Sequence, residues 1–210
     1  MMTQDDCERG LPTSSDSRMV AALYVEYRGV YWDLPGVEPW GLPERDAREY
    51  AGPHPVVAHP PCNRWAMPLA KVNETRYGHK VGDDGGCFAH ALDCVRRFGG
   101  VLEHPANTAA WRTFDLPKPL RGWQRAFCGG WVCQIAQVAY GHRARKATWL
   151  YAYGCDLPEL DTSEPEPTAY VSHLSPHYDM PRLSKREAKA TPIAFRDMLL
   201  DMARSVEART

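Results

Sequence analysis

The sequence predicts an α/β fold with a mainly parallel sheet and flanking helices. Short apolar runs rich in β-branched and aromatic residues alternate with helical patterns, which is typical of this class. The strongest helical pattern covers residues 87–98, and a new apolar run begins at residue 101. The 18 prolines and 16 glycines point to many loops and turns between these elements.

The first half of the chain predicts two strands separated by loops. The apolar run over residues 56–59 predicts a buried strand, which Pro60 and Pro61 end because neither proline has an N–H to donate. The predicted elements, in order, are a strand over residues 20–27, a loop over 29–43, a short helical turn over 44–50, the strand over 56–59 and a long polar loop over 63–86.

The second half predicts a stronger alternation of helices and strands. The helix over residues 87–98 is amphipathic and is followed by Gly99 and Gly100, a typical C-terminal stop. The further predicted elements are a strand over residues 101–103, a short helix over 108–114 with Asn107 as N-cap, an irregular stretch over 116–130, a helix or strand over 131–140, a strand over 148–153, an acidic proline-rich loop over 156–167 and an amphipathic helix over 192–206.

Length and composition predict one domain. We expect a disordered tail over residues 1–17 and a single α/β domain over 18–210, with residues 155–184 as a loop or linker insert. The net charge is −1, so any contact with nucleic acid must come from a local basic patch. Seven cysteines without a Cys-x-x-Cys pair, together with a polar first segment, predict a reduced cytoplasmic protein without a metal site. No apolar run is long enough to span a membrane.

Cys62 is the first candidate for chemistry. It follows the double proline and so lies on a loop at the carboxyl end of a predicted strand, where open α/β sheets bind ligands. A free thiol there can act as a nucleophile. The alternative is a rigid turn with a buried, inert cysteine.

Glu103 ends the next predicted strand, so neighbouring parallel strands would bring it to the same sheet edge as Cys62. A thiolate can add to C6 of a pyrimidine while a carboxylic acid protonates or hydrogen-bonds N3, which turns C5 into a carbon nucleophile. Arg143 and Arg145 are candidates for the positive charge that favours the thiolate. Alternatively, Glu103 forms a surface salt bridge, His59 and His104 are buried with hydrogen bonds only, and the arginines belong to a solvated or phosphate-binding basic run.

Several motifs together resemble a reduced DNA cytosine-5 methyltransferase of the kind found in phages and their hosts. Residues 60–62 are similar to the family's Pro-Cys loop, and residues 103–105 stand where the family has Glu-Asn-Val or Glu-Asn-Pro. Residues 140–154 resemble its Tyr-Gly-x-Pro-Gln-x-Arg-x-Arg segment with the following strand. Residues 182–187 and 191–206 are similar to its Arg-x-Leu-Thr-x-Arg-Glu segment and final helix.

The resemblance implies a trimmed Rossmann-like methyltransferase fold and a methyl transfer to cytosine C5 through a covalent cysteine adduct. The implied catalytic residues are Cys62, Glu103, Arg143 and Arg145, and the implied substrate contacts are Pro61, Asn63, Arg64 and His104. The implied partner is DNA, either a duplex with a flipped cytosine or a single strand.

The implied cofactor is S-adenosylmethionine. Residues 24–29 stand in the place of the family's glycine-rich cofactor loop, and Glu26, Asp46 and Thr191 are the residues expected to hold this cofactor. Two alternatives stay open. One keeps the cysteine chemistry with methylene-tetrahydrofolate as donor, and the other is a non-catalytic relative that binds DNA or a partner protein.

Overall fold

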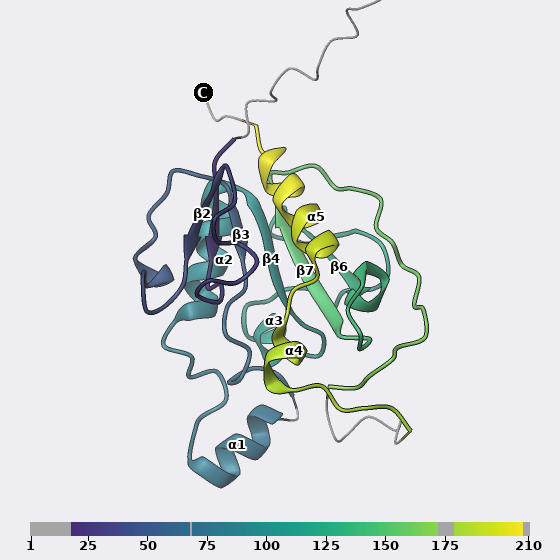
Figure 1. Cartoon of the computed structure of the whole chain (residues 1–210). Coiled ribbons are helices and arrows are strands. Elements are labelled where there is room, and N and C mark those ends of the chain that lie inside the picture. The colour runs from purple at the N-terminus through teal and green to yellow at the C-terminus, as the bar shows by residue number, and fades with distance from the viewer. Residues whose placement is uncertain (1–17, 68, 172–178, 208–210) are drawn as a thin grey trace, which may run out of the picture.

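The computed structural model describes residues 18–67, 69–171 and 179–207. The predicted tail over residues 1–17 lies outside this part. Seven strands form one sheet in the order β2-β1-β3-β4-β7-β6-β5, and helices cover both faces (Figure 1). The predicted α/β class is therefore confirmed. Within the described residues, no helix combines the length and the apolar character needed to cross a bilayer.

The first half of the sheet is parallel. It contains β2 (Val37–Trp40), β1 (Val20–Leu23), β3 (Val56–Ala58) and β4 (Gly100–Pro105). The strands are short, and β1 and β3 are fully buried. Tyr24 ends β1 earlier than predicted because its φ of 60° is left-handed.

The second half of the sheet is antiparallel. It contains β7 (Ala147–Tyr153), β6 (Trp131–Ala136) and β5 (Gln124–Arg125). The prediction of a mainly parallel sheet is therefore correct only for the first half. The segment over residues 137–146 that joins β6 to β7 is too short for the crossover that parallel strands require.

One long helix packs on each face of the sheet. Helix α2 (Cys87–Phe98) has the predicted bounds and covers one face, and α5 (Ile193–Arg204) covers the other. The alternation along each strand divides the core between these faces. In β1, Ala21 and Leu23 face α2, whereas Val20 and Ala22 face α5.

Several short elements differ from the sequence predictions. Strand β2 lies in the predicted loop over residues 29–43, and α1 (Leu69–Tyr77) lies in the predicted loop over 63–86. Helix α1 carries no apolar stripe, which explains why the helical period gave no signal there. Thr108, not Asn107, is the N-cap of α3 (Ala109–Thr113), because its hydroxyl accepts a hydrogen bond from the Ala110 N–H.

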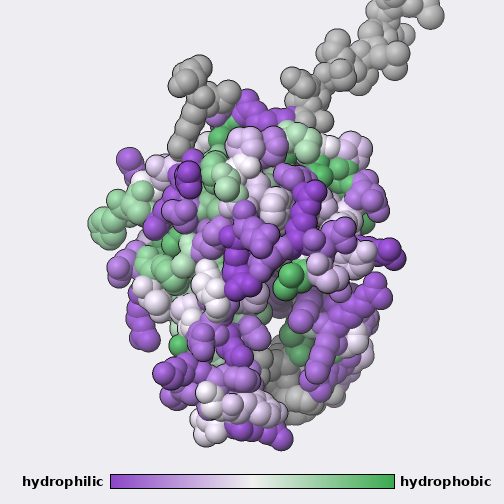
Figure 2. All heavy atoms as spheres, turned by 90° about the vertical axis from the view of Figure 1, so that its left-hand side faces the viewer, coloured by the Kyte–Doolittle hydropathy of each residue, from purple (hydrophilic) through white to green (hydrophobic). Residues whose placement is uncertain are grey.

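The remaining short elements lie at turns. The predicted turn over residues 44–50 contains the 3₁₀ helix η1 (Ala47–Glu49), and the ambiguous apolar segment is β6 followed by η2 (Gln137–Tyr140). Helix α4 (Lys185–Lys189) begins at a capping box made by Ser184 and Glu187. Figure 2 shows that hydrophilic side chains cover much of the face on the left of Figure 1, with small apolar patches between them.

Candidate functional site

Four elements converge at the carboxyl ends of β3 and β4. Ala58 pairs with Leu102 in the parallel ladder, so His59 lies next to Glu103. Strand β6 runs parallel to β4, and Gln137 follows its end at this edge. Strand β7 is antiparallel to β4, so Lys146, which precedes β7, reaches the same edge. The antiparallel half of the sheet therefore contributes directly to the site.

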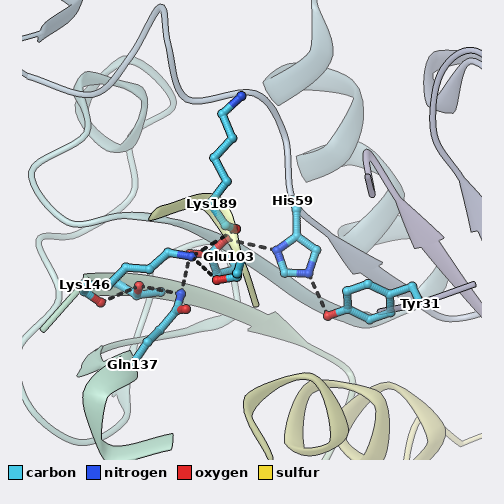
Figure 3. A network of polar contacts seen from close by, with 8 residues as sticks. Tyr31, His59, Glu103, Gln137, Lys146 and Lys189 are labelled. Atoms are coloured by element: carbon cyan, nitrogen blue, oxygen red, sulfur yellow. Dashed lines mark hydrogen bonds and ion pairs between the residues drawn. The ribbon is translucent and has the colours of Figure 1, made fainter. Parts of the chain in front are cut away.

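A chain of hydrogen bonds links the side chains at this edge (Figure 3). The Tyr31 hydroxyl donates to His59 Nε2 at 2.8 Å, and His59 Nδ1 donates to Glu103 Oε2 at 3.0 Å. These directions follow from the ionised carboxylate, which can only accept. Gln137 Nε2 donates to Glu103 Oε1 at 3.2 Å and to the Thr148 hydroxyl at 3.0 Å. Both carboxylate oxygens of Glu103 are thus fixed in position.

The Glu103 side chain is ionised at neutral pH. Burial alone would raise the pKa of this carboxyl, but the hydrogen bond from His59, together with the charge of Lys146, lowers its pKa below the ordinary value. The site therefore holds a buried carboxylate that remains charged because neighbouring groups stabilise it.

The Cys62 thiol is half-buried on a turn that follows β3. The backbone carbonyl of Cys62 accepts hydrogen bonds from the N–H groups of Trp65 at 2.9 Å and Ala66 at 2.8 Å. The Trp65 side chain is buried and packs on Phe88, and its indole N–H donates to Asp84 at 2.7 Å. The double proline and the buried indole therefore hold the thiol at a fixed place on the sheet edge.

The charges at this edge act on Cys62. Burial raises the pKa of the Cys62 thiol, the negative charge of Glu103 raises it further, and the positive charges of Lys189 and Lys146 oppose this rise. The net effect is a raised pKa, so the thiol is protonated at neutral pH in the free protein. Cys62 and Glu103 are therefore brought together at one edge, whereas their catalytic roles stay predictions.

Arg143 and Arg145 do not supply the positive charge at the thiol. Both side chains are exposed, and they form ion pairs with Glu187 at 3.0 Å and with Glu164 at 2.7 Å. Lys146, one residue further along, is the cation of this segment that acts on Cys62 and Glu103. Its φ of 41° turns the chain so that its side chain points to the edge.

His104 belongs to the core and not to the surface of the site. It follows Glu103 in β4, so its side chain points to the opposite face of the sheet. The ring is fully buried and packs on Phe88 and Trp111, with ring centroids 5.2 and 6.4 Å away. Burial lowers the pKa of His104 to about 4. This placement contradicts the expectation that His104 contacts a substrate.

The other implied substrate contacts flank Cys62 in sequence. Pro61 and Asn63 are exposed, and Arg64 is half-buried. The Arg64 carbonyl accepts a hydrogen bond from the Gly82 N–H at 2.9 Å, which ties this turn to the end of the long segment after α1. Pro61 and Asn63 are therefore open to solvent next to Cys62 in the chain.

The three residues expected to hold S-adenosylmethionine do not form one site. Glu26 is exposed in the loop after β1. Asp46 caps η1 and forms an ion pair with Arg48, on the face covered by α2. Thr191 precedes α5, which covers the opposite face.

The sheet edge next to β1 is also filled by side chains. The strand order reverses between β1 and β3, the place where open α/β sheets bind nucleotides. Here the buried Tyr31 ring packs on His59 with centroids 5.3 Å apart. Tyr24 packs on the opposite face of the sheet, which α2 covers, and its hydroxyl forms a hydrogen bond with His90 Nδ1 at 3.0 Å. The predicted residues therefore do not fit this cofactor.

Four residues of the site were absent from the sequence-based candidates: Tyr31, Gln137, Lys146 and Lys189. Tyr31 comes from the loop before β2, and Lys189 from the end of α4, so no local pattern links either one to Cys62. Gln137 and Lys146 flank the connection between β6 and β7. A prediction that β6 and β7 pair antiparallel would have placed both residues at this sheet edge.

No group of three or more His, Cys, Asp or Glu side chains in the part of the chain that the structure describes is arranged to hold a metal ion. Comparisons with protein-family models, with curated proteins and with solved structures found no match.

Proposed function

We propose that this protein modifies cytosine in DNA at C5 through a covalent adduct between Cys62 and C6 of the base. The observation that carries the proposal is the placement of Cys62 and Glu103 at the carboxyl ends of the paired parallel strands β3 and β4, with Lys146 before β7 at the same sheet edge. A thiol, a carboxylate and a cation at one edge are the groups that this reaction needs.

The first step is the addition of sulfur to C6 of the ring. The Sγ–C6 bond forms while the electron pair of the C5–C6 double bond moves into the ring and towards N3. A bound base removes water from the edge, and this desolvation raises the pKa of the nearby carboxyl. Glu103 can then share a proton with N3, and its second oxygen can accept from the exocyclic amine.

The adduct makes C5 nucleophilic. C5 then forms a bond to the incoming group, loses its proton, and the electron pair returns to expel the Cys62 thiolate from C6. The resemblance implies S-adenosylmethionine as the source of a methyl group, with methylene-tetrahydrofolate as the alternative. The proposal concerns the adduct-forming half of the reaction, which these donors share.

DNA is the proposed substrate because of this chemistry and the motifs. C6 of a stacked cytosine lies inside the duplex, so the base must be flipped out or come from a single strand to reach a half-buried thiol. Exposed basic side chains near the edge could contact phosphates, namely Lys189 and Arg143, the latter by exchanging its ion pair with Glu187 for a phosphate.

Exchange of the C5 hydrogen tests the proposal without a donor. A Cys62 adduct that reverses in D₂O leaves deuterium at C5, which mass spectrometry of the nucleosides detects. We expect exchange in cytosine of single-stranded or flipped DNA with the wild-type protein and with Cys128→Ala. Absence of exchange in duplex, single-stranded and nucleotide substrates would refute the proposal, as would unchanged exchange with Cys62→Ala.

The exposed basic side chains of Arg143 and Arg145 favour a second function, which is DNA binding without catalysis. This alternative predicts salt-sensitive binding that survives Cys62→Ala and is lost when Arg143 and Arg145 are both replaced by alanine. Retained binding in the double arginine variant would count against it. A filter-binding titration at two salt concentrations provides the measurement.

A further inference from the structure

The orientation of the Gln137 side-chain amide is fixed by its partners. Its Nε2 group donates to Glu103 Oε1 at 3.2 Å and to the Thr148 hydroxyl at 3.0 Å (Figure 3). The Thr148 hydroxyl itself donates to the Lys146 carbonyl at 3.0 Å, so its oxygen is left to accept from Gln137. An amide turned by 180° would place its oxygen against the Glu103 carboxylate. The nitrogen therefore faces Glu103, and both of its hydrogens are used.

The oxygen of the same amide has no hydrogen-bond donor. Gln137 is 1% exposed, and its Oε1 atom has no partner among the described residues. The neighbouring Lys146, whose carbonyl accepts from the Gln137 backbone N–H at 3.2 Å, directs its ammonium group to the carbonyls of Ala190 at 2.8 Å and Lys189 at 3.3 Å. A buried acceptor without a donor is unfavourable and rare in folded proteins. This oxygen therefore needs a donor that the described part of the chain does not supply.

The unpaired oxygen belongs to the candidate site. The side chains of His59 and Glu103 are 13% and 12% exposed, so the sheet edge is partly open at the carboxylate. A ligand group that reaches Glu103 Oε1 lies one amide group away from the oxygen of Gln137. Because this oxygen is shielded from bulk water, a hydrogen bond made to it counts more than one at the surface. Glu103 and Gln137 thus provide two neighbouring oxygen acceptors.

Two neighbouring acceptors match a ligand group that carries two N–H donors. The exocyclic amine of cytosine is such a group, because one of its N–H bonds lies on the side of N3 and the other on the side of C5. Uracil has a carbonyl oxygen at the same position, which can only accept. The pair of acceptors therefore favours a pyrimidine with an amino group at C4 and disfavours one with a carbonyl group there.

We infer that Gln137 is a specificity-determining residue, whose Oε1 atom accepts a hydrogen bond from the exocyclic amine of the base. This inference rests on the proposed function, since it takes the pyrimidine held against Glu103 as the ligand. The amine donates one N–H to Glu103 and the second to Gln137. Both partners of the Gln137 Nε2 group hold the amide in the orientation that presents the oxygen.

A binding cycle between the protein and the base tests this contact. The ligands are single-stranded thymine oligonucleotides with one central base, either cytosine or 2-pyrimidinone, which has hydrogen in place of the amine. Fluorescence anisotropy measures their affinities for the full chain with Cys62→Ala, so that no adduct forms. We expect this parent protein to prefer cytosine by roughly 10- to 100-fold. The further change Gln137→Met should reduce the preference by roughly 3- to 10-fold.

Three control variants separate the acceptor from a structural role. Gln134→Met removes an amide that contacts Trp149, and it should leave the preference within about twofold of the parent. His59→Phe removes the other hydrogen bond to Glu103 but leaves Gln137, so it should reduce the preference by less than Gln137→Met does. Gln137→Glu, in its protonated form, donates to Glu103 and keeps a carbonyl oxygen, so it should retain most of the preference.

Equal affinity of the parent protein for the two oligonucleotides would overturn the inference, as would an unchanged preference in Gln137→Met. An equal loss of preference in His59→Phe and Gln137→Met would also overturn it, because the amide would then act only by holding Glu103. If Gln137→Met is unfolded by circular dichroism, Gln137→Glu decides. A retained preference for cytosine supports the inference, and its loss contradicts the inference.

The two proposals fail in different ways. Binding needs no thiol, so a Gln137-dependent preference for cytosine without C5 exchange removes the proposed chemistry and keeps the recognition of the amine. C5 exchange together with an unchanged preference in Gln137→Met removes the inference and leaves the proposed function. Absence of binding to either oligonucleotide removes the inference as well.

Discussion

His59 and His104 occupy similar places in the sequence but different places in the structure. Each precedes a proline at the end of a strand, and the two strands are neighbours in the parallel half of the sheet. His59 bonds Tyr31 and Glu103 at the sheet edge, whereas His104 is enclosed by Phe88 and Trp111 in the core.

The difference comes from the alternation of side chains along a strand. His59 and Glu103 are partners in register, so they point to the same face. His104 is one residue further and points to the other face. One position therefore separates a histidine in the hydrogen-bond chain of the site from a histidine whose burial keeps it neutral. Proximity in sequence to a candidate acid is not evidence of a shared site.

The largest expected effect concerns the site at the sheet edge, where His59 contacts Glu103. Replacing Glu103 with Gln removes the group that shares a proton with N3 of the base, and we expect C5 exchange to fall by roughly 100- to 10,000-fold. Glu164→Gln, which removes the acid paired with the exposed Arg145, provides the control. A reduction of less than tenfold in Glu103→Gln would place the proton transfer elsewhere.

The next largest effect concerns His104 in the core. Replacing His104 with Ala leaves a cavity beside Phe88 and Trp111, so the free energy of unfolding should fall by about 3 kcal/mol. His79→Ala, at an exposed position, should change it by less than about 0.5 kcal/mol. Urea denaturation of the three proteins measures both values. Equal stability of His104→Ala and the wild type would show that this histidine is not packed as described.

A pH titration sharpens the same contrast. The pKa of His104 is about 4 in the folded protein and 6.5 ordinarily, so the unfolded chain binds a proton first as the pH falls. Between pH 6.5 and 4 this favours unfolding, by about 2.5 kcal/mol at pH 4.5. His104→Phe removes this contribution. We therefore expect the loss of stability between pH 7 and 4.5, measured by urea denaturation, to be smaller in His104→Phe. An equal loss in both proteins would contradict the prediction.

The smallest expected effect concerns the support of His59. Tyr31→Phe removes the hydroxyl that donates to His59 Nε2 but keeps the buried ring. The stability should fall by about 1 kcal/mol because the imidazole nitrogen loses its partner. Tyr77→Phe, which changes an exposed hydroxyl on α1, is the matched control. Thermal unfolding that is unchanged in Tyr31→Phe would show that this hydrogen bond does not hold the histidine.

The sequence predicted the direction of the strands correctly in the first half of the sheet and wrongly in the second half. Helix α2 was predicted at its observed bounds, because an amphipathic period and a terminal Gly-Gly are local signals. The pairing of β7 with β4 depends on long-range contacts, and apolar strands look alike whether they run parallel or antiparallel. That pairing decides which residues reach the edge.

The candidate site was predicted in part for the same reason. Cys62 and Glu103 come from the ends of two parallel strands, so their meeting follows from local patterns. Lys146 was passed over in favour of Arg143 and Arg145, because the direction of its side chain depends on a left-handed backbone angle. Tyr31 and Gln137 enter through tertiary contacts that no spacing in the sequence reveals.

The central claim is that Cys62 and Glu103 act on one pyrimidine ring, and covalent capture tests it most directly. A nitrogen at position 5 makes C6 of 5-azacytosine more electrophilic, so an adduct with DNA containing this base should accumulate without a donor. Mass spectrometry of the tryptic peptide over residues 49–64, in which Cys62 is the only cysteine, would locate it. We predict a modified Cys62 in the wild type, a strongly reduced amount in Glu103→Gln and none in Cys62→Ala. An unmodified peptide in the wild type, or an adduct on the exposed Cys128 instead, would contradict the account.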